Sequence, residues 1–261
     1  MRRSVVIGAV DRAVPDQGRQ LFGSFRELID SSDFPTVFDD LRPAGLDDAR
    51  PPDAAVAASA PVQRARPSVL KVTGQAPSCR RSTEGSGFVF APERVVTNAH
   101  VVAGVERPFV EVGQRRLPAT VVLYDPDRDL AVLRVPGLSR PALAFSSAPA
   151  DPADDAVVLG YPLDGPFRAD PARIIERLRA RGADIYGDDL VTREIYTVRG
   201  LVRSGNSGGP LLDAQGRVQG VVFAAAADDT SVGYALTAAY VAPVVAAVRE
   251  TTAPVGTQGC A

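Results

Sequence analysis

The feature of this sequence that most constrains its fold is a long series of short, strand-like segments that begins at residue 68. Each segment is rich in β-branched residues and is bounded by Gly, Pro or Asp, as strands and their turns usually are. Many short strands at this spacing predict an antiparallel sandwich or barrel, so we expect an all-β domain. The clearest segments are residues 68–72, 87–90, 94–97, 119–124, 129–135, 156–160, 194–198 and 218–223.

The segment at residues 172–180 is open to two interpretations. Ile174, Ile175 and Leu178 fit one face of a helix, whereas the surrounding strands favour another strand. After the last strand-like segment, residues 237–250 carry apolar residues at helical spacing. This pattern predicts a C-terminal helix.

The first part of the chain has a different character. Leu21 and Phe25 belong to an apolar helical face, and residues 1–46 are typical of short helices joined by turns. Such a segment packs on a neighbouring domain or partner, or forms the juxtamembrane end of a larger protein. Residues 47–67 carry Pro, Ala and charge without periodicity, which indicates a linker. We therefore expect a helical segment, this linker and then one β-rich domain at 68–261.

The scarce residue types exclude several classes of protein. The 261 residues include one His and two Cys, too few for the usual zinc sites. A dinucleotide-binding glycine fingerprint and a P-loop are both missing, so we expect neither a metal nor a cofactor. The net charge of −2 gives no electrostatic reason to bind nucleic acid. No apolar run reaches the roughly 20 residues that span a bilayer, and residues 5–10 are too short for an export signal.

Residues 205–210, GNSGGP, are the first candidate for chemistry. Glycine on both sides allows Ser207 to sit on a tight turn with its hydroxyl exposed. Glycine also lets neighbouring N–H groups point at one spot, as an oxyanion hole requires. A simple hairpin loop would use the same residues, so this motif alone does not establish a site.

A nucleophilic Ser needs a base, and His100 is the only imidazole of the chain. A lone His is usually a surface or satisfied core residue, but this one lies in a compact motif at the end of a strand. The third member should be a carboxylate that orients the imidazole. Asp129 is the best candidate because it opens an apolar strand, whereas Asp125 and Asp127 flank a proline and are typical of solvated turns.

The order of these three residues along the chain separates the known hydrolase folds. The GNSGG string also matches the nucleophile elbow of α/β-hydrolases, but no His follows Ser207. The subtilisin order requires an Asp on a core strand near the N-terminus, and none suits. The order His100, Asp129, Ser207 is that of chymotrypsin.

Three ordered blocks give the sequence a resemblance to a known family. TNAHVV at 97–102, DLAVL at 129–133 and GNSGGPLL at 205–212 are similar to the signature blocks of bacterial trypsin-like serine proteases of the HtrA type. Over residues 68–250 the chain resembles most closely the MarP-type membrane-anchored periplasmic proteases of actinobacteria. The supporting strings are LGYPL, DIYG and IYTVRG at residues 159–163, 184–187 and 195–200.

The resemblance implies a fold and a role for each residue of the motifs. His100 is expected to be the general base, Asp129 its orienting partner and Ser207 the nucleophile. The N–H groups of Gly205 and Ser207 are expected to form the oxyanion hole. Two six-stranded antiparallel β-barrels, at about residues 68–140 and 141–236, would pack together with the triad between them.

The resemblance also suggests how a peptide substrate binds. Phe223, Ala224 and Ala225 resemble the strand that pairs with the substrate backbone beside the P1 pocket. Leu201 stands where the base of that pocket is expected. A Leu there would disfavour basic P1 residues, so we expect an apolar P1.

Other features of the family concern the cell envelope. In the resembled family, a pair equivalent to Cys79 and Cys260 forms a disulfide, although their spacing alone would also fit coincidence or two free thiols. Disulfides persist in oxidising compartments, so the pair suggests an extracytoplasmic site. The family carries N-terminal transmembrane helices, which this chain lacks, and has roles in stress at the envelope. HtrA proteins also carry a PDZ domain, for which too few residues follow Ser207.

We therefore predict a cofactor-independent serine endopeptidase of the periplasmic side of the envelope, membrane-anchored in the full-length family, that acts on protein or peptide substrates. A first alternative is a latent or inactive protease fold that serves as a binding module. A second is a serine esterase on the same scaffold. The N-terminal segment or the Cys pair could also keep the triad out of register until cleavage or oxidation.

Overall fold

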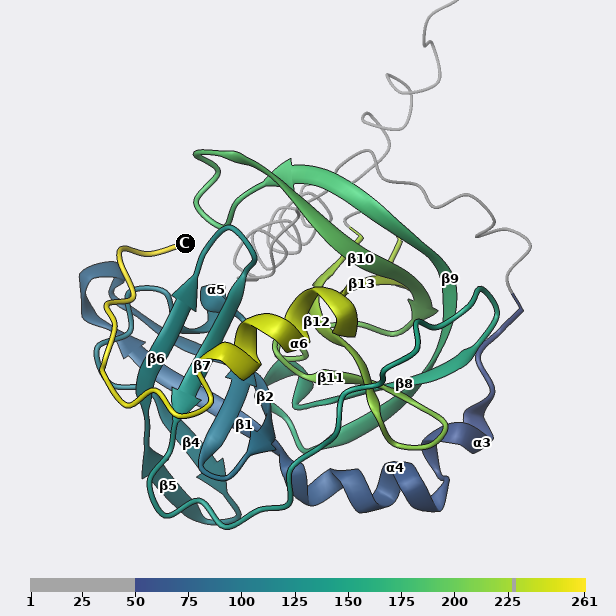
Figure 1. The fold of residues 1–261 in the computed structure, drawn as a ribbon, viewed down its shortest axis with the longest axis horizontal. Helices are drawn as coiled ribbons and strands as arrows, with labels where there is room; N and C mark the ends of the chain where they lie inside the picture. The colour runs from purple at the N-terminus through teal and green to yellow at the C-terminus, as the bar shows by residue number, and fades with distance from the viewer. Residues whose placement is uncertain (1–49, 227–228) are drawn as a thin grey trace, which may run out of the picture. The chain divides into compact units, whose positions relative to one another are not determined.

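The structure is a computed structural model that describes residues 50–226 and 229–261 (Figure 1). The helical segment predicted at residues 1–46 lies outside the described residues. The described part consists mainly of antiparallel strands in two sheets. No helix in this part is long and apolar enough to span a membrane.

The first sheet has seven strands in the order β5-β4-β1-β2-β3-β7-β6. Its hairpins follow one another along the chain, and its strands pair antiparallel throughout. Val72, Val95 and Leu133 are buried in its interior. The strands are β1 (Val69–Ala76), β2 (Arg81–Ala91), β3 (Arg94–Thr97), β4 (Phe109–Val112), β5 (Arg115–Pro118), β6 (Thr120–Asp125) and β7 (Leu130–Arg134).

The second sheet closes into a six-stranded barrel in the order β10-β13-β12-β11-β8-β9. The ambiguous segment at 172–180 belongs to its long strand β9, so the interpretation as a strand is the right one. Val158, Tyr196 and Leu211 are buried in the barrel interior. The strands are β8 (Asp155–Gly160), β9 (Arg168–Ala183), β10 (Leu190–Gly200), β11 (Pro210–Asp213), β12 (Val218–Ala225) and β13 (Val232–Thr237).

The predicted all-β, chymotrypsin-type architecture is confirmed. The expected count of six strands holds for the second barrel, whereas the first sheet has seven. The strand-like segments of the sequence did not include β4, β5, β11 and β13. Strands β4 and β5 are mostly half-buried or exposed, whereas β11 and β13 are fully buried. A third buried cluster contains Phe88 and Leu130 of the first sheet together with Leu159 and Val221 of the barrel, so the two sheets share a core.

Helices are short in the described part. The predicted C-terminal helix is confirmed as α6 (Ala238–Ala247), which begins after the N-cap Thr237. The region predicted as an open linker instead contains α3 (Ala54–Ala57) and α4 (Ala60–Ala65). The remaining helical turns are α5 (Ala99–Val102) and three single turns, η1 (Arg66–Ser68), η2 (Pro77–Cys79) and η3 (Pro162–Asp164).

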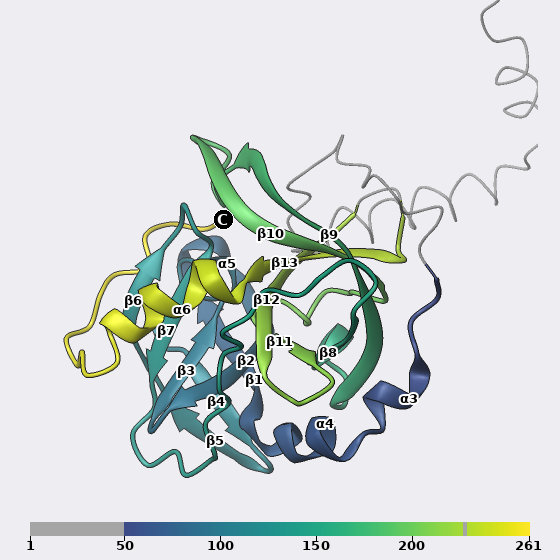
Figure 2. The ribbon, with the colours of Figure 1, turned by 45° about the vertical axis from the view of Figure 1, so that its right-hand side comes forward.

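The β9–β10 hairpin extends from the barrel beyond its closed part (Figure 2). The Tyr186 hydroxyl, in its connecting loop, lies 2.5 Å from the Tyr124 hydroxyl of β6. The chain end is tied to the first sheet by the disulfide between Cys79 and Cys260, whose Cα atoms are 6.1 Å apart. The structure thus contains the disulfide that the resemblance implied.

Candidate active site

His100 lies on the single helical turn α5, directly after strand β3. Strand β3 pairs with β7, and the register places Thr97 opposite Ala131. The end of β3 and the beginning of β7 are therefore neighbours. This pairing brings His100 close to Asp129, although the two residues belong to different hairpins.

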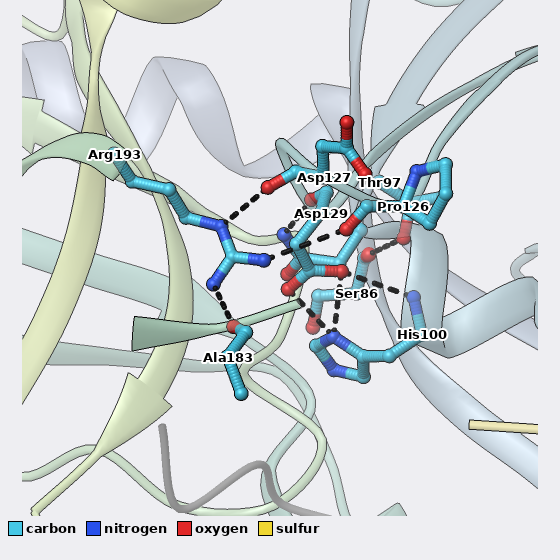
Figure 3. A network of polar contacts seen from close by, with 9 residues as sticks. Ser86, Thr97, His100, Pro126, Asp127, Asp129, Ala183 and Arg193 are labelled. Carbon is cyan, nitrogen blue, oxygen red and sulfur yellow. Dashed lines mark hydrogen bonds and ion pairs between the residues drawn. The ribbon is translucent and has the colours of Figure 1, made fainter. Parts of the chain in front are cut away.

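Asp129 is the last residue of the turn between β6 and β7, and its carboxylate faces His100 (Figure 3). The Nδ1 atom of His100 lies 2.8 Å from Asp129 Oδ2, and the His100 amide donates to Oδ1 at 3.0 Å. The Asp129 backbone has φ of 55°, in the left-handed region, and its carbonyl oxygen accepts from Asn98 Nδ2 at 2.7 Å. With its proton on Nδ1, the imidazole keeps Nε2 free to accept another.

The electrostatics of this pair favour an ionised carboxylate. Asp129 is only 1% exposed, and burial by itself would raise its pKa. Three effects outweigh this rise and leave the pKa of Asp129 lowered. They are the charge of His100, the two hydrogen bonds from His100 and the charge of Arg193. An ionised Asp129 in turn stabilises an imidazolium ion at His100.

Ser207 lies on the glycine-rich turn before β11 and is 3% exposed. Gly205 and Gly208 on either side have φ of +88° and +82°, values that favour glycine. The turn is held against β2, because the Ser86 amide donates to the Ser207 carbonyl oxygen at 2.8 Å. The Ser86 hydroxyl also donates to the Gly205 carbonyl oxygen at 2.6 Å.

Gly85 on β2 separates the Ser207 turn from the His100 helix. A Cβ atom at Gly85 would lie 2.7 Å from a methyl group of Val101 and 3.1 Å from the Ser207 carbonyl oxygen. Val101, the residue after His100, and the backbone of Ser207 therefore both pack against Gly85, where a larger residue would not fit. No hydrogen bond between the Ser207 hydroxyl and His100 is found within residues 50–226 and 229–261. Such bonds are often long in free enzymes and shorten when substrate binds.

The amide groups of the Ser207 turn fall into two sets. The amides of Asn206, Gly208 and Gly209 donate to backbone carbonyl oxygens at 2.8–2.9 Å. The amides of Gly205 and Ser207 make no hydrogen bond to the part of the chain that the structure describes. These are the two groups that the sequence predicted for an oxyanion hole.

The predicted substrate-binding residues lie on two segments beside this turn: Leu201 precedes it in the chain, and residues 223–225 follow Val222, whose carbonyl oxygen accepts from the Gly208 amide. Leu201 is half-buried in the segment between β10 and the turn. Phe223 and Ala224 are fully buried, and Ala225 is half-buried, on β12. Strand β11 begins opposite Val221, so no strand of the described chain pairs with residues 223–225 on that side of β12.

Comparison with known proteins settles the family. The model of the trypsin-like peptidase domain matches residues 85–221, which include the His100, Asp129 and Ser207 blocks. The chain belongs to the trypsin-like peptidase family. Within residues 50–226 and 229–261, this trypsin-like domain has no group of three or more His, Cys, Asp or Glu that could hold a metal ion.

Individual relatives place the trypsin-like domain among bacterial proteases of the HtrA and MarP type. The chain is 44% identical to serine protease Rv3671c of Mycobacterium tuberculosis over its whole length, and it spans 66% of that protein. The crystal structure of the active form of Rv3671c protease covers 81% of this chain and 93% of its own, with 50% identity and a TM-score of 0.79. A probable periplasmic serine endoprotease, DegP-like, of Chlamydia pneumoniae is 30% identical over 56% of this chain and 29% of its own length.

Two residues of the site were missed by the sequence reasoning. Ser86 is fully buried and links the Ser207 turn to β3, because its carbonyl oxygen accepts from the Thr97 hydroxyl at 2.8 Å. A polar residue between two glycines, Gly85 and Gly87, was the available signal. Arg193, the other missed residue, is 1% exposed, although its strand β10 also carries the charged residues Glu194 and Arg199. Local sequence does not separate Arg193 from the other arginines of β9 and β10, so its burial gave no signal.

Proposed function

We propose that this chain is a serine endopeptidase that hydrolyses peptide bonds through a His100-Asp129-Ser207 triad. The observation that carries the proposal is the buried His100–Asp129 pair, whose side chains lie 2.8 Å apart, together with the turn that carries Ser207 between two left-handed glycines. Kinship with serine proteases supports the same reaction. The roles of the individual residues rest on the geometry and on their motifs.

The proposed hydrolysis uses His100 Nε2, the Ser207 hydroxyl and the Asp129 carboxylate. His100 Nε2 takes the proton of the Ser207 hydroxyl as its oxygen attacks the carbonyl carbon of the substrate. The C–N bond of the substrate then breaks, and the imidazolium gives its proton to the leaving amine. In the second half of the reaction, His100 takes a proton from a water molecule as the water attacks the ester carbonyl of the acyl-enzyme. The bond to Ser207 then breaks, the imidazolium returns the proton to the Ser207 oxygen, and the carboxylic acid product leaves. Asp129 stays ionised throughout and stabilises the imidazolium.

The amides of Gly205 and Ser207, which make no hydrogen bond within the described residues, supply the electrostatic stabilisation in this proposal. Each is free to donate to the oxygen that becomes negative in the tetrahedral intermediate. Removal of one such donor typically costs a factor of about 10²–10³ in rate. The glycine at 205 is needed because a Cβ there would overlap the carbonyl oxygen of Tyr161.

The substrate is an extended peptide in this proposal. The edge of β12 at Ala224 and Ala225 offers backbone groups with which such a peptide can pair. Leu201 lies close to Ser207 along the chain and supports an apolar P1 residue. Substrates of this class include any unfolded polypeptide with accessible apolar residues.

The location proposed for the enzyme is the extracytoplasmic side of the cell envelope. A relative is named a probable periplasmic endoprotease, and the Cys79–Cys260 disulfide persists in oxidising compartments. Membrane anchoring and a role in stress are implied by the resemblance to MarP-type proteases alone.

Hydrolysis of an unfolded protein substrate tests the function. We expect the purified chain to cleave reduced casein, with new termini after apolar residues mapped by mass spectrometry, and Ser207→Ala to leave it intact. Turnover of a nitrophenyl ester without peptide cleavage would instead assign the site to a serine esterase. If neither substrate is hydrolysed by a protein whose fold is intact by circular dichroism, the site is that of a latent binding module. The lack of a Ser207–His100 hydrogen bond within the described residues agrees with that outcome.

A further inference from the structure

Arg193 on β10 is a buried arginine whose guanidinium group lies beside the proposed acid of the triad (Figure 3). The residue is 1% exposed. Its Nε donates to the Asp127 carbonyl oxygen at 2.8 Å, and Nη2 donates to the Pro126 carbonyl oxygen at 3.4 Å. Its Nη1 donates to the Ala183 carbonyl oxygen at 3.1 Å. The guanidinium fork is therefore bound to three backbone carbonyls.

These contacts join the two sheets at the position of the acid. Pro126 and Asp127 belong to the β6–β7 turn of the first sheet, whereas Arg193 belongs to the barrel. The same turn carries Asp129, whose amide donates to the Pro126 carbonyl oxygen at 3.2 Å. Arg193 thus holds, from the second barrel, the turn from which Asp129 projects.

The charge of Arg193 is also complementary to this site. Burying a guanidinium group is costly unless hydrogen bonds and an opposite charge compensate for lost water. The three carbonyls supply the hydrogen bonds, and Asp129 supplies the nearby negative charge. The other titratable groups that face Asp129 are His100 and Tyr124, and the Arg193 guanidinium lies 6.0 Å from the ring of Phe223.

We propose that Arg193 is a positioning residue that holds the β6–β7 turn so that Asp129 faces His100. An Asp with left-handed φ persists only when its surroundings fix it, and this arginine is part of those surroundings. The acid–base pair then depends on contact between the barrel and the first sheet. The predicted loss of turnover rests on the function proposed above, whereas the effect on the His100–Asp129 pair does not.

The single histidine of the chain makes this proposal directly measurable. With ¹⁵N-histidine labelling, His100 is the only labelled residue, and its Nδ1 proton gives a downfield NMR signal while it is held against Asp129. We would compare Arg193→Gln and Arg193→Lys with the parent protein, all in a Ser207→Ala background. Lys keeps the charge but cannot reach three carbonyls as the planar fork does.

Arg173 on β9 provides the matched control. Its side chain is 14% exposed and donates to the Asp155 carboxylate at 2.5 Å and to the Ala153 carbonyl oxygen at 3.4 Å. These partners lie at the start of β8 and just before it, and neither is on the β6–β7 turn. Arg173→Gln therefore removes an arginine that is bonded to a carbonyl and a carboxylate without touching the turn.

We expect the downfield signal of His100 to weaken or shift in both Arg193 variants and to stay unchanged in Arg173→Gln. On acidification the signal should disappear at a higher pH in Arg193→Gln than in the parent, because the cation that helps keep Asp129 ionised is gone. In enzyme that retains Ser207, kcat should fall at least about tenfold with KM within about twofold.

An unchanged His100 signal in a folded Arg193→Gln protein, accompanied only by a lower Tm, would overturn the proposal and leave Arg193 a structural brace. If Arg193→Gln fails to fold, Arg193→Lys carries the same comparison. A changed signal in variants of a protein that never hydrolyses peptides would support the positioning role and contradict the proposed function.

Discussion

At the residue scale, Asp129 combines burial, a left-handed backbone and a carboxylate bonded to His100. The sequence distinguished it from Asp125 and Asp127 because it opens an apolar strand. The structure places Asp125 in a local hydrogen bond to the Arg128 amide at 2.9 Å, away from the imidazole. The contact from Arg193 could not be predicted, because it comes from the other barrel and depends on how the two sheets pack.

The lowered pKa of Asp129 predicts how stability depends on pH. A carboxylate whose folded pKa lies below its unfolded value of about 3.9 stabilises the fold above that pH. This stabilisation is lost as the pH falls through the folded pKa. We therefore expect the difference in free energy of unfolding between wild type and Asp129→Asn to shrink as the pH falls below about 4.

Urea titrations at a series of pH values measure this difference. Asp127→Asn is the matched control, because that side chain is exposed and only its backbone carbonyl contacts Arg193. Its free energy of unfolding should follow wild type at every pH. A wild-type advantage over Asp129→Asn that stays constant down to pH 2 would contradict the interpretation.

Gly208 next to the nucleophile predicts a second effect of single residues. Its φ is +82°, and a Cβ there would overlap the Ser86 carbonyl oxygen and the Thr97 hydroxyl. Gly113, with φ of +62°, has nothing within 4 Å of the same position. We expect Gly208→Ala to destabilise the protein by more than about 2 kcal/mol and Gly113→Ala by about 1 kcal/mol. Equal losses in urea unfolding would show that the turn has more room than the structure gives it.

At the scale of elements, strands with a run of β-branched residues could be predicted from the sequence. The partly exposed strands β4 and β5 could not, and neither could β11 and β13, which are buried but contain few β-branched residues. Strands such as β7 and β12 are buried along almost their whole length, so their sequences are apolar. Strand β5 carries two exposed arginines, Arg115 and Arg116, and its sequence does not separate it from a loop. Helices α3 and α4 have four and six residues, too few to show helical periodicity in a segment rich in Pro, Ala and charge.

Val62 on α4 tests whether this region is an integral part of the fold. Its side chain is 1% exposed and belongs to the core cluster shared by both sheets. Val62→Ala should lower the free energy of unfolding by about 1–3 kcal/mol, because burial is lost and a cavity remains. Gln63→Ala, at the neighbouring exposed position, should change it by less than about 0.5 kcal/mol. Indistinguishable denaturation midpoints for the two variants would mean that α4 does not pack as described.

At the scale of the whole molecule, the Cys79–Cys260 disulfide closes a loop with a sequence separation of 181 residues. The chain-entropy model assigns such a cross-link a stabilisation of up to about 5 kcal/mol. We expect the Cys79→Ser/Cys260→Ser double variant to lose several kcal/mol of unfolding free energy, measured in urea. Reductant should destabilise wild type and leave the double variant unchanged; an equal response of both would contradict a structural role for the bond.

Because the two sheets share one core, the sequence could predict which residues belong to the site but not how they are arranged in space. The chain order of His100, Asp129 and Ser207 predicts which residues form the proposed triad. The contact between His100 and Asp129 depends on the β3–β7 register, and the position of the Ser207 turn depends on Ser86, which binds it to β2. These are long-range contacts that no local pattern encodes.

The central claim is that Ser207 is a nucleophile activated by His100. Whole-protein mass spectrometry after fluorophosphonate treatment tests it most directly, with Ser207→Ala and His100→Ala treated in parallel. The account predicts one adduct on wild type and none on either variant. No adduct on a folded wild-type protein, or an equal adduct on His100→Ala, would contradict it.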